Sequence, residues 1–401
     1  MMLDRTVDET FRNPISAAEL ERRWTAVRAH MKTQGIDALV VGGASGVASG
    51  YFRWFTGLPG LDRIPRTVIF PLEGFMTLVE HGPIGGEFSL DPALPASRGI
   101  DRRFTTPTFL MAVAYTGHYD AEIVAREINK AGYGKIGLVG PTGMYYAFCS
   151  HLKELLGESK LANLTNEVDH LRAIKSPEEI DFIRRAASMQ DDLIDTLRDF
   201  IKPGLRDYEI IDYAQYLGHL AGSDQGIFLG SSAPPGTPAV LKSRLLQGRR
   251  LQPGDVFMLM IENNGPGGYY TEIMRQFVLG KPPQDFAAAF QKAIDAQKYT
   301  LDLLKPGAAS SKILAAHNQY MRERGLPEER RLYGHSQGLD LVERPLLRAE
   351  ETMPIRANMN IAVHPEIATK EFYAIVCDNF LIGPDGRQEC LHRTPQEIIQ
   401  L

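Results

Sequence analysis

Residues 200–210, "FIKPGLRDYEI", decide the fold because their pattern returns later in the chain as "LLKPGAASSKI" at 303–313. Two further segments also return: "GDVFMLMI" at 254–261 as "ANMNIAVH" at 357–364, and "GYYTEIMRQFVLG" at 268–280 as "EFYAIVCDNFLIG" at 371–383. All three pairs keep an offset of 103 residues without a gap. A repeat at a fixed offset marks one structural unit used twice. We therefore predict a pseudo-symmetric α+β domain whose strands form one sheet with the helices of both copies on one face.

The first part of the chain alternates helical and strand patterns. Residues 17–35 have helical spacing and end on Gly35, residues 36–43 have the pattern of a buried strand, and residues 66–80 that of a hairpin. A further helix over 119–132 and a strand over 135–140 complete an α/β unit of about 150 residues. Ser176, Pro177 and Glu179 form a capping box that starts a long helix carrying Ile180 and Ile183 inward. The sequence thus predicts two domains, 1–168 and 169–401.

Composition narrows the function classes. Of 401 residues, 44% are apolar and 23% charged, and 44 basic residues face 49 acidic ones, for a net charge of −5. The basic residues are dispersed, which argues against nucleic acid and anionic membranes as partners. No apolar run approaches the roughly 18 residues of a membrane span, and the first residues lack the order of a signal peptide. Three widely spaced cysteines argue against a disulfide framework. We expect a soluble cytoplasmic protein.

Two histidines are candidates for chemistry. His364 ends the apolar stretch 359–363, and the repeat aligns it with Ile261, beside Glu262. His335 lies in "LYGHSQGLDLVERP" (332–345), where nearby glycines let the backbone approach closely. From the residues alone, each histidine could be a metal ligand, an acid or base, or a packed side chain.

These segments, in order, resemble the pita-bread superfamily of creatinase, prolidase and aminopeptidase P, over nearly the whole chain. "GIDALVV" and "YFRWFTGLPG" are similar to the creatinase-type N-terminal domain, and "RAIKSPEEIDFIRRAA" to the opening of the catalytic domain. Four later segments resemble the family signatures: "PGDVFMLMIENNGPGGYYTEIMRQFVLG", "GHSQGLDLVERP", "NIAVHPEI" and "VCDNFLIGPDG". The resemblance implies an α/β N-terminal creatinase-like domain followed by an α+β pita-bread catalytic domain with an internal pseudo-two-fold repeat.

Metal-dependent members of that superfamily hold two divalent ions with two aspartates, one histidine and two glutamates. The resemblance puts these five positions at Ile261, Glu272, His335, His364 and Cys377. Only His335 keeps the ligand type of the family, and a further histidine of the peptidases falls at Val342. Two adjacent dications need bridging carboxylates, and an isoleucine cannot ligate. A two-metal peptidase centre is therefore not expected.

A single metal site remains open. Glu272, His335 and His364 are the components of a two-histidine, one-carboxylate triad for iron or another transition metal. Cys377 could add a soft ligand for zinc, but a small buried apolar role is the more usual one for a free cysteine. Glu272 could instead be an ion-pair partner of the nearby Arg275.

The resemblance to creatinase and the ectoine hydrolases implies the alternative of metal-free hydrolysis. Such enzymes open C–N bonds in small amidine-like or cyclic substrates and need a base, an acid and carboxylates. The candidates are His335, His364, Glu262, Glu272 and Glu343. The acid/base histidine of creatinase has no counterpart in "VLKSRLLQGRRLQPGD" (240–255), so a distinct substrate is implied.

The remaining candidates concern substrate binding. In the family, the N-terminal segment of one subunit reaches the active site of its partner, which would make Trp54 and Arg53 a substrate wall in a homodimer; core packing is the alternative. Tyr270 and Asp378 are further substrate-binding candidates. We predict a hydrolase that cleaves a C–N bond of a small polar molecule of the amidine, cyclic amide or amide type, with no metal or with one. The alternatives are a metal-dependent proline-specific dipeptidase or aminopeptidase, and a non-catalytic protein that binds a small molecule.

Overall fold

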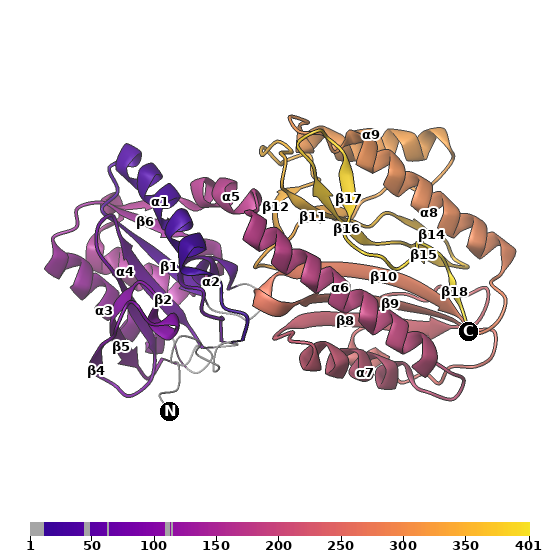
Figure 1. Cartoon of the computed structure of the whole chain (residues 1–401), viewed down its shortest axis with the longest axis horizontal. Helices are drawn as coiled ribbons and strands as arrows, with labels where there is room; N and C mark the ends of the chain where they lie inside the picture. Colours follow the sequence, from indigo (N-terminus) through magenta and orange to yellow (C-terminus); the bar gives the residue numbers. More distant parts are fainter. Residues whose placement is uncertain (1–11, 44–48, 62–63, 109–112, 114) are drawn as a thin grey trace, which may run out of the picture. The chain divides into compact units, whose positions relative to one another are not determined.

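The computed structural model describes residues 12–43, 49–61, 64–108, 113 and 115–401 (Figure 1). The chain divides into two compact units, Met1–Arg172 and Ala173–Leu401. The sequence predicts this boundary at residue 168. Within the described residues, no helix is at once long enough and apolar enough to cross a membrane.

The first unit is a seven-stranded mixed sheet in the order β4-β5-β3-β2-β1-β6-β7. The predicted hairpin is confirmed, since β2 pairs antiparallel with β3, and the two predicted buried strands, β1 and β6, pair in parallel. Its elements are α1 (Ala17–Gln34), β1 (Ala38–Gly43), α2 (Gly50–Thr56), β2 (Arg66–Pro71), β3 (Met76–His81), β4 (Gly86–Ser89), β5 (Ile100–Thr106), α3 (Thr116–Ala131), β6 (Ile136–Val139), α4 (Tyr146–Leu156), β7 (Leu161–Asn163) and α5 (Thr165–Ala173), the last of which runs to the boundary.

The second unit contains the repeat. Its elements are α6 (Pro177–Phe200), α7 (Asp207–Leu220), β8 (Gly226–Ala233), β9 (Val256–Asn264), β10 (Tyr270–Val278), α8 (Gln284–Leu303), α9 (Ser310–Glu323), β11 (Gly334–Ser336), β12 (Glu343–Leu346), β13 (Asn360–Val363), β14 (Glu366–Ala368), β15 (Tyr373–Ile375), β16 (Asp378–Ile382), β17 (Gln388–Cys390) and β18 (Ile399–Gln400). In both copies a helix ends, a KPG turn follows and a second helix begins, and these helix ends keep the offset of 103 residues seen in the sequence. The repeat is therefore structural.

The prediction that the strands form one sheet is wrong. They form a four-stranded sheet, β18-β10-β9-β8, a five-stranded sheet, β12-β11-β13-β16-β17, and a separate β14–β15 pair. An isolated bridge between Met274 and Cys377 connects β10 to the second copy. The reason is a break in the second copy: β10 runs without interruption, whereas its counterpart divides at Val376 and Cys377 into β15 and β16, which pair with different strands.

Side-chain alternation along β9 sets up the two faces of the four-stranded sheet. Phe257, Leu259 and Ile261 pack with residues of α6 and α7, whereas Met258 and Met260 pack with residues of α8. Figure 1 shows α6 and α7 beside β8–β10, and α8 and α9 toward the other strands of the same unit. Because strand side chains point to alternate faces, Glu262 lies on the face of Met260, not on that of Ile261.

The helix that opens the second unit begins as the sequence predicts. The Ser176 hydroxyl accepts a hydrogen bond from the Glu179 backbone N–H at 3.2 Å, and the Glu179 carboxylate accepts one from the Ser176 N–H at 2.8 Å. Ile180 and Ile183, predicted to face inward, are buried. This capping box fixes where α6 starts and hence how it lies on the sheet.

Candidate functional site

Three side chains from three strands converge in the second unit. Glu272 lies on β10, His335 on β11 and His364 directly after β13, and one ligand atom of each lies within 4.8 Å of the others. The Nε2 atoms of His335 and His364 are 3.8 Å and 3.9 Å from Glu272 Oε2. All three side chains are buried, and the two imidazole rings meet edge to face with centroids 5.5 Å apart. The structure thus brings together the three residues predicted for a single metal site, while their role as ligands stays a prediction.

Local sequence explains how the two histidines reach Glu272. A Cβ atom on Gly334 would lie 2.4 Å from Leu347 Cδ1, so glycine before His335 allows β11 to pack closely. His364 is held through its backbone, since its N–H donates to Tyr333 O at 2.8 Å and Arg331 Nη2 donates to its carbonyl oxygen at 3.1 Å. Both histidines are therefore fixed from outside the site.

The imidazoles have the protonation state that metal binding needs. Burial lowers the pKa of His335 to about 4, and burial together with His335 and Arg331 lowers that of His364 well below its usual value. His335 Nδ1 lies 3.1 Å from Ser336 O, so a proton on Nδ1 donates there and leaves the lone pair of Nε2 facing Glu272. His364 Nδ1 is buried without a hydrogen-bond partner.

Glu262 lies opposite Glu272 in the antiparallel β9–β10 pair, so the two carboxylates share one face. Burial and the neighbouring Glu272 raise the pKa of Glu262, and burial raises that of Glu272 to about 7. Gln337 Nε2 donates to Glu262 Oε1 at 2.8 Å. Two carboxyls and two neutral imidazoles in one buried group are suited to transferring protons.

The residues present fit one metal ion and not two. Two neutral nitrogen donors and one carboxylate are a donor set that suits a single transition-metal ion. Ile261 belongs to the apolar cluster of α6 and α7, on the opposite face from Glu272. Cys377 is fully buried in the apolar cluster of α8, its thiol donates to Glu272 O at 3.7 Å, and burial raises its pKa, so it is held as a neutral thiol. The apolar role favoured for Cys377 agrees with this placement.

Glu343, predicted to be catalytic, accepts hydrogen bonds from a lysine and from a loop backbone. Its Oε2 accepts from Lys175 Nζ at 2.7 Å, and both side chains are buried. Its Oε1 accepts from the backbone N–H groups of Leu339 and Asp340. These bonds hold the carboxylate in the loop that follows β11, and its catalytic role stays a prediction.

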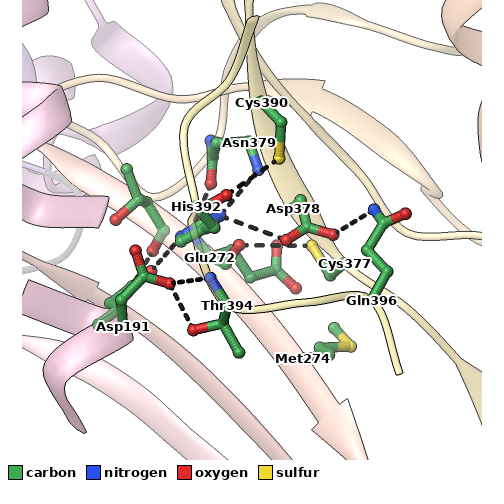
Figure 2. Close-up of polar contacts among 12 residues, drawn as sticks. Asp191, Glu272, Met274, Cys377, Asp378, Asn379, Cys390, His392, Thr394 and Gln396 are labelled. Atoms are coloured by element: carbon green, nitrogen blue, oxygen red, sulfur yellow. Dashed lines mark hydrogen bonds and ion pairs between the residues drawn. The ribbon is translucent and has the colours of Figure 1, made fainter. Parts of the chain in front are cut away.

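Asp378, whose role in substrate binding stays a prediction, belongs to a buried ion pair. Its Oδ1 is 2.6 Å from Arg275 Nη2, and neither side chain has exposed surface. Gln396 Nε2 donates to its Oδ2 at 2.7 Å, as Figure 2 shows. The alternative that Arg275 pairs with Glu272 is wrong, because Arg275 forms its ion pair with Asp378.

The other substrate-binding candidates have varied surroundings. Tyr270 is 1% exposed, and its hydroxyl donates to Gln225 Oε1 at 3.3 Å. Trp54 is 2% exposed and packs edge to face on Phe55 at 5.3 Å within the first unit, which favours the alternative of core packing, and its role as a substrate wall stays a prediction. Arg53 is partly exposed, and its contact with a partner subunit stays a prediction.

Three carboxamides beside the site were missed: Gln337, Asn360 and Asn379. All three are fully buried and bond to one another or to the two glutamates. A signal was present in "GHSQG", "MNIAV" and "CDNF", since an amide inside an apolar stretch must find partners when buried.

Comparisons with known proteins agree with this architecture. The profile described as "Metallopeptidase family M24" matches residues 181–384. An uncharacterized peptidase of Bacillus subtilis strain 168 is 24% identical over 296 residues, covering 70% of this chain and 79% of that protein. A Xaa-Pro dipeptidase of Pyrococcus furiosus is 23% identical over 257 residues, which cover 63% of this chain and 73% of that protein. The crystal structure of an X-Pro aminopeptidase from Thermotoga maritima superposes with a TM-score of 0.77 at 18% identity, over 94% of this chain and 99% of that one.

The profile match covers half of the chain, and the superposition on the aminopeptidase spans 94% of this chain, so it includes residues of both units. The chain therefore belongs to metallopeptidase family M24.

Proposed function

We propose that the chain hydrolyses a C–N bond of a small polar molecule at the Glu272–His335–His364 group, with one divalent transition-metal ion held by these three side chains. The observation that carries the proposal is their convergence within 4.8 Å. Membership of a peptidase family supports the enzyme class, hydrolases acting on C–N bonds. The departures at Ile261, His364 and Cys377 support a substrate other than that of the two-metal peptidases.

The residues of the chain account for the proton transfers of such a reaction. Hydrolysis joins the oxygen of a water molecule to the carbon, breaks the C–N bond and sends one proton of the water to the nitrogen. We assign to Glu262 the role of taking that proton and returning it to the leaving nitrogen; its position opposite Glu272 and its hydrogen bond from Gln337 support this role. An ion bound at the triad would supply Lewis-acid polarisation of the bond under attack.

Metal analysis of the purified protein tests the proposal. We expect about one transition-metal ion per chain, lost on His335→Ala and on His364→Ala and kept on His219→Ala, an exposed histidine outside the site. A panel of small amides, lactams and amidines, scored by amine release, tests turnover. A metal-free preparation with full activity would overturn the metal part of the proposal.

A second candidate is a metal-dependent dipeptidase or aminopeptidase specific for proline, supported by the relatives that are named Xaa-Pro dipeptidases. It predicts close to two ions per chain and cleavage of Xaa-Pro dipeptides that a chelator abolishes. The third candidate, a non-catalytic binding protein, predicts small-molecule binding without turnover. If the protein only binds, the wild type and His335→Ala should both show no turnover.

A further inference from the structure

The three buried carboxamides connect the two sheets that supply the site. Gln337 follows β11, Asn360 lies on β13 and Asn379 on β16, which are neighbouring strands of the five-stranded sheet. Glu262 and Glu272 belong to β9 and β10 of the other sheet. The two histidines come with the five-stranded sheet, so the spacing of histidines and carboxylates depends on how the two sheets are joined.

The hydrogen bonds of these amides cross that junction. Asn379 Oδ1 accepts from the backbone N–H of Glu272 at 2.6 Å. Its Nδ2 donates to Gln337 Oε1 at 2.8 Å and to Asn360 Oδ1 at 3.0 Å. Gln337 Nε2 donates in turn to Glu262 Oε1 at 2.8 Å and to Leu341 O at 3.0 Å.

These bonds allow one orientation of each amide. A carboxamide has two N–H donors and one carbonyl, and both donors of Gln337 and of Asn379 are used. A flipped Gln337 would point its oxygen at the Glu262 carboxylate and its N–H groups at those of Asn379. Since all three residues are fully buried, water cannot replace a lost partner.

We propose that Gln337, Asn360 and Asn379 form an amide relay that positions both carboxylates of the site, and this rests on the proposed function. Asn379 holds the backbone N–H of Glu272, and this positions the Glu272 carboxylate against His335 and His364. Gln337 fixes the side chain of Glu262. Asn360 holds Asn379 and donates through Nδ2 to Gln337 O at 3.3 Å. None of the three is a metal ligand; all are positioning residues.

Two measurements on the whole chain test the relay: Co²⁺ titration followed by absorption, and hydrogen exchange of the Glu272 amide. Asn379→Leu removes the acceptor of that amide, and we expect Co²⁺ binding at least tenfold weaker, because loss of a partner behind the ligands typically costs about 10–100-fold in metal affinity. The Glu272 amide should also exchange faster. Asn379→Asp keeps an acceptor oxygen for the Glu272 amide but sets a second oxygen against Gln337 Oε1 and Asn360 Oδ1. It should therefore restore the slow exchange in part, which a merely structural loss would not show.

Two further variants serve as controls. Gln276 is a fully buried glutamine on β10, the strand of Glu272, and it bonds to Tyr373 O and not to the site. In Gln276→Met the Co²⁺ affinity should therefore stay within threefold of the wild type. Gln337→Leu removes the bond to Glu262 and leaves the acceptor of the Glu272 amide, so that amide should still exchange slowly. A Glu272 amide that exchanges as slowly in Asn379→Leu as in the wild type overturns the relay, whatever the Co²⁺ result. A wild type that binds no Co²⁺ overturns the single metal of the proposed function, and the exchange result then decides the relay alone.

Discussion

Arg275 is a fully buried cation whose every N–H has a partner. Its guanidinium donates to Asp378 Oδ1 and to the carbonyl oxygens of Met274, Cys377, Thr394 and Pro395 at 2.6–3.0 Å. A buried charge that loses its partner keeps the cost of desolvation without the compensating attraction.

We expect Asp378→Ala to lower the free energy of unfolding by about 3–5 kcal/mol, the typical cost of breaking a buried ion pair. The control is Glu389→Ala, which removes a half-exposed partner of Arg184 and should cost less than about 1 kcal/mol. Urea unfolding measures both. An Asp378 variant as stable as the Glu389 variant would contradict the assigned role.

His317 makes stability depend on pH away from the site. It is fully buried on α9, its Nδ1 lies 3.0 Å from Thr300 Oγ1, and burial lowers its pKa to about 4. Between pH 6.5 and pH 4 the unfolded chain binds a proton that the folded chain does not. The folded state is therefore progressively destabilised as the pH falls through this window, and this group has no effect above it.

We expect His317→Asn to flatten the dependence of the unfolding free energy on pH by about 1 kcal/mol per pH unit between pH 6 and pH 4.5. His219→Ala, at an exposed position, is the matched control and should leave the slope unchanged. Equal slopes in wild type and His317→Asn would show that this histidine titrates alike in both states.

How much of the site could be predicted from sequence differs from residue to residue. Glu272, His335 and His364 could be found because the family resemblance aligns them with ligand positions, and the repeat places His364 at a strand end. The partners of Glu343 and Asp378 could not, because Lys175 and Arg275 lie 168 and 103 residues away along the chain. Sequence shows which side chains carry charge; only the packed strands show which charge neutralises which.

At the scale of elements, α6 is the helix whose start is best defined by sequence. Its N-cap, Ser176, closes both bonds of the capping box. We expect Ser176→Ala to lower the free energy of unfolding by about 1 kcal/mol and Ser176→Gly by only a few tenths, because glycine adopts the N-cap conformation readily. Urea denaturation of the two variants measures this difference. Equal losses would mean that the hydroxyl contributes through packing instead of capping.

The elements of the second copy show the limit of arguing from a repeat. The helix ends on either side of the KPG turn return at the predicted offset, since the turn and the apolar spacing beside it are local. The sheet is not repeated, because Val376 and Cys377 separate β15 from β16, and these two strands pair with different partner strands. Strand partnership depends on contacts distant in sequence, which the local pattern does not contain.

For the whole molecule, the expectation that remains to be tested is the homodimer. We expect sedimentation to give about twice the 44.6 kDa of one chain, and Arg53→Ala to reduce turnover while the metal content stays unchanged. Lys32→Ala, exposed on α1, is the control for the first unit. A fully active monomer would contradict both expectations. Cytoplasmic location likewise stays a prediction.

The contacts of Arg275 also bear on how the chain folds during its synthesis. Thr394 and Pro395 accept hydrogen bonds from this guanidinium, and β18 completes the four-stranded sheet beside β10. A ribosome that has released β8, β9 and β10 has not yet supplied Thr394, Pro395 or the two residues of β18 that pair with the end of β10. More than a hundred further residues must be synthesised before the end of β10 gains its pairing with β18 and Arg275 gains its bonds to Thr394 and Pro395. We therefore expect the second unit to complete its fold only after its last residues have left the ribosome.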